Sequence, residues 1–168
     1  MAVSAPAQRN VRPIPEGYGT ITPSLVTHDA AAAIEFYTRA FGASELSRMA
    51  DPNGGKIWHA ELQVGDCRIM LSDEFPEMDP TSRSPKTLGG TAVNLHVYVR
   101  DTDAAFQRAV DAGATVVMPP MDMFWGDRYG KLTDPFGHSW SIATHQEDLS
   151  EEEMFRKMHE QPAGCMQS

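Results

Sequence analysis

The sequence has few cysteines, few basic residues and no long apolar run. Its two cysteines, Cys67 and Cys165, are too few for the disulfide framework of a secreted domain. We therefore expect a reducing, cytoplasmic location. No apolar run approaches the ~20 residues that a membrane-spanning helix needs, and the first 19 residues lack the apolar centre of a secretory signal. These absences predict no membrane partner.

Basic residues are outnumbered by acidic ones, with 14 Lys and Arg against 23 Asp and Glu and a formal net charge of −9. Binding to nucleic acid depends on a surplus of Lys and Arg, so we expect no nucleic-acid partner. The sequence also contains no nucleophile elbow, phosphate-binding loop or Cys–His pairing. Hydrolase and NTPase functions are therefore unsupported.

What the sequence does contain is a long internal repeat. A strand pattern precedes a helix that is capped by Asp29 and ends at Gly42. After a Pro-, Ser- and Gly-rich linker at 74–91, a second strand precedes a helix between Asp101 and Gly113. Each half then continues with three strands. Because each half alone would leave one sheet face unburied, we expect the two halves to pack together in an α+β domain.

The repeat sets the predicted boundaries. We expect a final helix that begins with a capping box of Ser150 and Glu153. The predicted parts are a mobile N-terminal arm at 1–17, a single domain at 18–147 (module one 18–73, linker 74–91, module two 92–147), and a C-terminal helix with a disordered tail at 148–168.

Two motifs, "AAIEFYTRAFGA" in the first module and "DPFGHSWSI" in the second, resemble the vicinal oxygen chelate superfamily. This is the group of glyoxalase I, extradiol dioxygenases, fosfomycin resistance enzymes and bleomycin-binding proteins, and the chain looks most like its PhnB-like branch. The resemblance implies two βαβββ modules that form a curled mixed-sheet cup. It also implies a homodimer, with the cup closed either within one chain or across the dimer.

Metal-dependent members of this superfamily place one ligand on the first and last strand of each module. Matching by motif assigns these positions to Thr22, Met70, Asn94 and Ser141. Ni, Zn, Fe and Mn sites favour imidazole, carboxylate or thiolate ligands. The resemblance therefore leads us to expect no cofactor, and it disfavours a divalent metal.

Strand alternation adds further candidates on the cup face. His96 and Tyr98 share the polar face of the fifth strand with Asn94. His96 either contacts a ligand or bonds to a neighbouring strand. Arg68, on the fourth strand, either binds a carboxylate or another anion or pairs with an acid at the rim.

Two further pairs of side chains could serve either a functional or a structural role. His59 and Glu61 lie at i and i+2 on one strand face, which suits either an acid–base pair or a solvated surface. With His96 they would make a replacement metal set, although no spacing demands it. Phe124 and Trp125 border the predicted cup opening and suit either an adaptable apolar pocket or ordinary core.

The stretch "KLTDPFGHSW" predicts a tight hairpin with His138 at its exit. Regular alternation places this ring with Trp140 and Ile142, on the helix side of the sheet. We expect His138 to complete the turn and to take no part in chemistry.

Two functions from different classes remain open. The first is a protein that binds a small organic molecule in an apolar cup without metal. The alternative is a lyase, isomerase or dioxygenase that uses an atypical metal site or metal-free acid–base catalysis, with His96, Tyr98, His59 and Glu61 as the best catalytic candidates. The predicted ligand contacts are Thr22, Ser24, Arg68, Met70, Asn94, His96, Tyr98, Phe124, Trp125 and Ser141.

Overall fold

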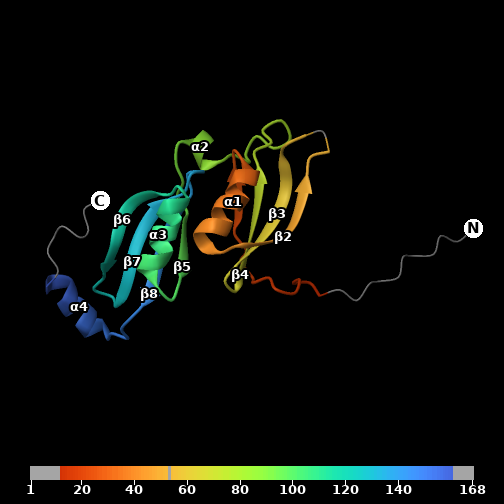
Figure 1. Cartoon of the computed structure of the whole chain (residues 1–168). Coiled ribbons are helices and arrows are strands. Elements are labelled where there is room, and N and C mark those ends of the chain that lie inside the picture. The colour runs from red at the N-terminus through yellow and green to blue at the C-terminus, as the bar shows by residue number, and fades with distance from the viewer. Residues whose placement is uncertain (1–11, 53, 161–168) are drawn as a thin grey trace, which may run out of the picture.

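The computed structural model describes residues 12–52 and 54–160. Two four-stranded sheets stand side by side, each covered by one long helix (Figure 1). The first module contains β1 (Ser24–Thr27), α1 (Ala30–Phe41), β2 (Ser44–Ala50), β3 (Ile57–Val64) and β4 (Cys67–Asp73). The second contains β5 (Asn94–Tyr98), α3 (Thr102–Ala112), β6 (Thr115–Asp122), β7 (Asp127–Thr133) and β8 (Ser139–His145). The predicted α+β class with two βαβββ modules is confirmed.

Each sheet places the first strand of its module beside the last. The strand orders are β1-β4-β3-β2 and β5-β8-β7-β6, and the β1–β4 and β5–β8 pairs are parallel. Ser24 therefore lies opposite Met70, and His96 lies opposite Ser141. This register brings side chains more than 40 residues apart in the chain onto one face.

The two long helices begin and end where the sequence predicts. Asp29 accepts a hydrogen bond from the Ala32 amide at 2.9 Å, and Asp101 accepts one from Ala104 at 3.0 Å. Gly42 ends α1 with φ of 67°, in the left-handed region that favours glycine.

The modules are joined through their helix sides. Helices α1 and α3 pack against each other, and aromatic rings of α1 meet Trp140 of β8, which lies 4.5 Å from Phe41 and 5.5 Å from Tyr37 between ring centroids. The buried Asp134 carboxylate accepts from the Tyr37 hydroxyl at 2.8 Å and from the Trp140 indole at 2.9 Å. One carboxylate thus links an α1 side chain to the last hairpin of module two.

His138 lies in the same junction. Its backbone amide donates to Asp134 Oδ1 at 2.9 Å, and its ring Nε2 lies 3.2 Å from the carbonyl oxygen of Val26 in β1. Burial lowers the pKa of this imidazole. The ring therefore joins module two to module one, whereas the backbone of His138 completes the predicted turn.

The connecting and terminal segments hold two further helices. The linker contains α2 (Pro85–Leu88), where Thr87 Oγ1 donates to Glu74 at 2.6 Å. Helix α4 (Glu151–Glu160) begins with the predicted capping box, since the Ser150 amide donates to Glu153 at 2.9 Å. The greater part of the predicted arm and the tail beyond α4 lie outside the described residues.

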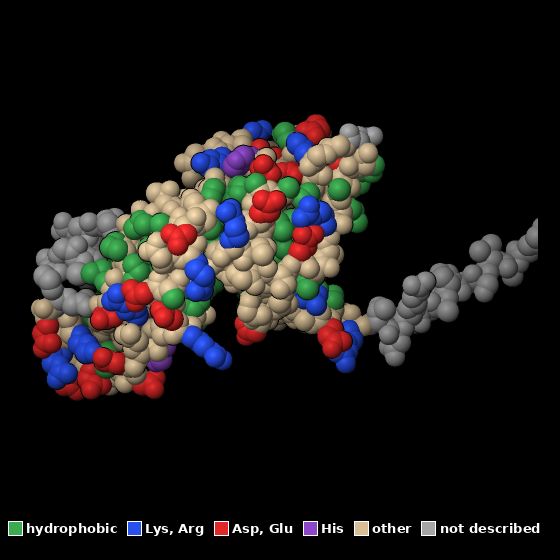
Figure 2. All heavy atoms as spheres, viewed as in Figure 1, with side chains coloured by type: hydrophobic (Ala, Val, Ile, Leu, Met, Phe, Trp, Pro, Cys, Tyr) green, Lys and Arg blue, Asp and Glu red, His purple; other side chains and the backbone are tan. Residues whose placement is uncertain are grey.

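Helix α4 lies on the side of module two that faces away from module one (Figure 1). None of its side chains is buried, and acidic and basic groups are dense over it at the lower left of Figure 2. No helix among the described residues is long and apolar enough to cross a membrane.

One local prediction is wrong. Strand β1 begins at Ser24, so Thr22 precedes the strand on which it was expected. Pro23 has no amide hydrogen to donate to a ladder, and pairing starts after it. On β3, Trp58 is 40% exposed although Ala60 and Leu62 of the same strand are buried, and the β2–β3 register shifts beside it.

Candidate functional site

The open face of the second sheet carries a hydroxyl and amide cluster. Asn94 donates to Ser141 Oγ at 2.8 Å, and His96 Nδ1 lies 2.7 Å from the same oxygen. Ser139 in turn donates to Asn94 Oδ1 at 2.9 Å. The structure therefore brings together the predicted residues Asn94, His96 and Ser141, and their polar groups satisfy one another.

A row of aromatic rings continues from this cluster. The ring centroids of His96 and Tyr98 are 4.6 Å apart, those of His96 and Tyr129 are 6.0 Å apart, and those of Tyr129 and Trp125 are 5.5 Å apart. Phe124 completes the row at 5.0 Å from Trp125. Such a row offers flat faces on which a planar molecule can stack.

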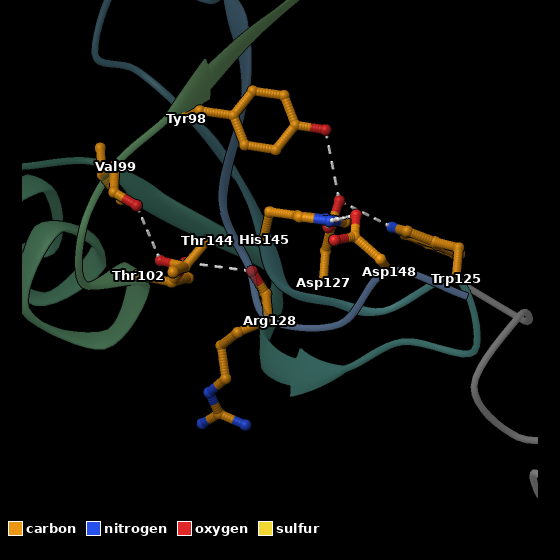
Figure 3. A network of polar contacts seen from close by, with 9 residues as sticks. All are labelled: Tyr98, Val99, Thr102, Trp125, Asp127, Arg128, Thr144, His145 and Asp148. Atoms are coloured by element: carbon orange, nitrogen blue, oxygen red, sulfur yellow. Dashed lines mark hydrogen bonds and ion pairs between the residues drawn. The ribbon is translucent and has the colours of Figure 1, made fainter.

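The buried carboxylate of Asp127 bonds to two members of this row, Tyr98 and Trp125 (Figure 3). It accepts from the Trp125 indole at 3.0 Å and from the Tyr98 hydroxyl at 3.4 Å, and one of its oxygens lies 2.8 Å from His145 Nδ1. Burial, followed by the Asp127 charge, raises the pKa of Tyr98. Asp148 and then Asp127 raise the pKa of His145, which favours the imidazolium.

Arg128 follows Asp127 in sequence but serves a different purpose. Its guanidinium points away from Asp127 in Figure 3 and makes two hydrogen bonds with Asp103, at 2.8 and 2.7 Å. These bonds raise the pKa of Arg128. On the same side Thr102 donates to the Arg128 carbonyl at 3.0 Å. This group fastens α3 to the sheet and leaves no free cation for a ligand.

The open face of the first sheet carries a cluster of charged side chains. His59 Nε2 lies 3.3 Å from Glu61 Oε1, as the i, i+2 spacing predicts. Glu61 Oε2 lies 3.9 Å from Arg68 Nη1, beyond hydrogen-bond distance. The Tyr18 ring lies 4.5 Å from the Arg68 guanidinium. The Tyr18 hydroxyl, followed by His59, lowers the pKa of Glu61.

A cleft of about 800 Å³ lies between the two modules. Three segments form it: the strand β5, the β3–β4 hairpin and the chain at 17–23. Its lining includes the apolar side chains of Ile21, Leu95 and Val97, and the buried Trp140 of β8 lies behind them. Its size and lining are those of a small-molecule pocket.

Three of the predicted contacts, Arg68, His96 and Tyr98, line this cleft. The other predicted positions, which are Thr22, Ser24, Met70, Asn94, Phe124, Trp125 and Ser141, are outside its lining. The sequence reading missed Gly17 and Tyr18, which it assigned to the arm and to the start of the domain. The triplet "GYG" at 17–19, an aromatic ring between two residues without side chains, was the available signal.

The four positions matched to metal ligands do not fit a divalent metal. Thr22, Asn94 and Ser141 offer neutral oxygens and Met70 a thioether, and the hydroxyl of Ser141 already bonds to its neighbours. Within residues 12–52 and 54–160, no three His, Cys, Asp or Glu side chains gather as a metal site. The replacement set is also divided, because His59 and Glu61 belong to module one and His96 to module two.

Comparison with known proteins agrees with this geometry. The model of the Glyoxalase/Bleomycin resistance protein/Dioxygenase superfamily matches residues 19–142. The chain belongs to this superfamily. The match extends from just before β1 into β8, so it includes both modules of the superfamily fold and most of the cleft.

Relatives within the superfamily cover most of the chain. The protein Rv0887c of Mycobacterium tuberculosis (strain H37Rv) is 46% identical over 145 residues, which is 86% of this chain and 85% of that protein. The crystal structure of TioX from Micromonospora sp. ML1 is similar at 32% identity with a TM-score of 0.59, covering 74% of this chain and 97% of that one. A PhnB protein from Bacillus cereus shares the fold at 24% identity with a TM-score of 0.59, over 75% of this chain and 99% of its own.

Proposed function

We propose that this superfamily member binds a small, largely apolar organic molecule in the cleft between its modules, without a metal ion. The observation that carries this proposal is the cleft of about 800 Å³, with apolar walls and a few polar groups at fixed positions. Small-molecule sites have this combination of an apolar surface with sparse, well-placed polar contacts. The poor fit of the matched metal positions supports binding without metal.

The aromatic groups favour a flat ligand. His96 and Tyr98 line the cleft, and their rings meet edge to face at 4.6 Å. A planar molecule that entered beside β5 would find these ring faces together with the apolar side chains of Leu95 and Val97. The proposed ligand class is therefore aromatic or conjugated organic molecules.

The test is a thermal-shift screen of small aromatic molecules, with elemental analysis of untagged protein. At a ligand concentration of about 100 Kd, binding adds about 2.7 kcal/mol of stability. For a chain of this size, that corresponds to a rise in Tm of roughly 5–10 °C. Val97→Trp, which fills the cleft, should abolish the rise, whereas Leu88→Trp on the exposed end of α2 should retain it.

If the protein contained one equivalent of metal, and if the ligands found in the screen bound only in its presence, the metal-free part of the proposal would be overturned. Hits that survive Val97→Trp with unchanged affinity would place the ligand elsewhere and overturn the assignment of the cleft.

Metal-free catalysis is the second candidate, and the geometry of His96 is the observation that favours it. The 2.7 Å contact between His96 Nδ1 and Ser141 holds the imidazole at the cleft wall in a fixed orientation, as a general base requires. In that case His96→Ala would abolish turnover of a bound molecule while retaining its binding. Equal loss of binding and turnover would indicate a contact residue instead.

We also propose that the chain forms a homodimer. Large apolar side chains are exposed on the two outer strands, including Leu46 and Met49 on β2 and Val116 and Val117 on β6. A second copy of the chain could cover these surfaces and close the open sheet faces. Sedimentation velocity at several protein concentrations measures this directly, and a monomer at all concentrations would contradict it.

A further inference from the structure

Arg68 differs from two other arginines on the described sheets. Arg48 holds Glu45 through two hydrogen bonds of 2.8 Å, and Arg128 holds Asp103 in the same two-pronged manner. Arg68 has its carboxylate neighbour, Glu61, at 3.9 Å. Its Nε is fully shielded and has no hydrogen-bond partner among the described residues. A guanidinium with donors to spare is ready to bind an added acceptor.

The chain holds this guanidinium in place from one side. The Tyr18 ring lies over it at 4.5 Å, an arrangement that stabilises a cation. Gly17 packs so closely that a Cβ at this position would lie 2.6 Å from Arg68 Nη2. The backbone at Gly17 also has φ of 82°, which favours glycine. The segment at 17–18 is therefore a strap that keeps Arg68 positioned before any ligand arrives.

The nearby acid does not neutralise Arg68 by a direct bond. Glu61 directs Oε1 toward His59 Nε2 at 3.3 Å and also interacts with the Tyr18 hydroxyl. Arg68 meanwhile lines the cleft beside apolar groups. The chain has a net charge of −9, so most of its surface repels anions. An anion binds best beside a positively charged side chain that is partly shielded from water, where the attraction is stronger.

We propose that the cleft selects organic anions, with a carboxylate or sulfonate on Arg68 and an apolar body along Leu95 and Val97. This inference rests on the proposed function and names its ligand class. The anionic group would accept hydrogen bonds from the terminal nitrogens of the guanidinium, since the Arg68 side chain is 24% exposed while its Nε is shielded. The uncharged remainder of the ligand would lie on the apolar wall opposite.

The experiment compares two probes of nearly equal shape, 2-naphthoate and its neutral amide 2-naphthamide, as competitors of the uncharged dye Nile red. The wild-type chain should bind the acid at least tenfold more tightly than the amide. Charge-assisted hydrogen bonds of about 1.5–3 kcal/mol correspond to roughly ten- to a hundredfold. Arg68→Met should remove this preference, measured as the ratio of the affinities for the acid and the amide within the same variant.

Two further variants control the test. Arg48→Met removes one positive charge from the same module outside the cleft, and it should leave the preference intact. Arg68→Lys retains the charge but lacks the planar fork, so it should show an intermediate preference even if Arg68→Met does not fold.

Each outcome decides a separate point. If the wild-type chain shows no preference for the acid, or if Arg48→Met loses the preference as fully as Arg68→Met, the anion inference is overturned while binding in the cleft stands. If Nile red fails to bind, or binds Val97→Trp as tightly as the wild type, the proposed function fails and the inference fails with it.

Discussion

The two modules share one topology, but their open faces use polar groups differently. In module two Asn94, His96 and Ser141 bond to one another, and the Asp127 carboxylate contacts three side chains. In module one Arg68 lies against Tyr18 and near Glu61 with its Nε hydrogen unbonded. A repeat of βαβββ units therefore fixes where side chains lie but does not fix whether they are free to bind.

This difference separates residues that stabilise the fold from residues that are available to bind a ligand. A polar group whose hydrogen bonds are all made within the protein costs free energy to remove, because its partners lose a bond. A buried donor without a partner is already destabilising, so its removal costs little. Stability measurements on matched variants therefore distinguish the two kinds of residue before any ligand is known.

The largest effect is expected for Asp127→Asn in module two. Trp125, Tyr98 and His145 all contact the Asp127 carboxylate, and the amide group of Asn would place its own N–H donors against them. The free energy of unfolding should therefore fall by about 3 kcal/mol. Urea unfolding followed by circular dichroism measures the change. Asp111→Asn, an exposed control whose carboxylate accepts from Gln107, should change it by less than ~0.5 kcal/mol. A similar small change for both variants would contradict the supporting role of Asp127.

A smaller loss is expected for Ser141→Ala. Both Asn94 and His96 would lose their contact with the buried hydroxyl, at a cost of about 1–2 kcal/mol. The same unfolding measurement applies, with Ser47→Ala on the exposed strand β2 as the control. If Ser141→Ala left the free energy of unfolding unchanged, water would replace the hydrogen bonds of Ser141 at no cost, and the supporting role of the cluster would be contradicted.

The C-terminal segment should show a local dependence on pH. Asp148 and Asp127 raise the pKa of His145, so its stabilising contribution is full below pH 6.5 and is lost as pH rises through the folded-state pKa. The amides of Gln146 and Glu147, which donate to the Gly126 carbonyl, should then exchange hydrogen faster. NMR titration with exchange rates tests this, and His145→Gln should flatten the profile.

The pKa of His138 is shifted in the opposite direction to that of His145, and the same NMR titration measures both. Burial lowers its pKa, so its contribution is full above pH 6.5 and is lost as pH falls through the folded-state value. A His138 resonance that titrated above 6.5 would contradict this assignment.

The smallest effect is expected for Arg68→Met in module one. The variant loses the contact with Tyr18 but also removes a shielded donor without a partner, so the free energy of unfolding should change by no more than ~0.5 kcal/mol. A loss of about 2 kcal/mol or more in urea unfolding would show that Arg68 supports the fold, as Asp127 does.

Local rules were enough to predict much of the fold. The caps at Asp29 and Asp101 and the alternation of β5 each depend on neighbours within a few residues, and all three are observed. The pairing of His59 with Glu61 also follows from i, i+2 spacing. The proximity of Ser141 to Asn94 and His96 required the superfamily resemblance, because Ser141 is on β8 and the other two residues are on β5.

The remaining features depend on register and on irregular chain. Asp127 and His145 are partners only because β7 and β8 pair in a specific antiparallel register, which no local pattern encodes. The strap at Gly17 and Tyr18 has no periodicity to indicate which strand it covers. Pro23 was visible in the sequence, and its missing amide hydrogen should have moved Thr22 out of β1.

The carboxylate of Asp134 has a consequence for how the molecule unfolds. It is bonded to Tyr37 in one module and to Trp140 in the other, and the His138 ring reaches the Val26 carbonyl across the same junction. Opening either module would expose these groups in the other without partners. The two halves of the repeat should therefore melt together, as a single calorimetric transition whose van't Hoff and measured enthalpies agree.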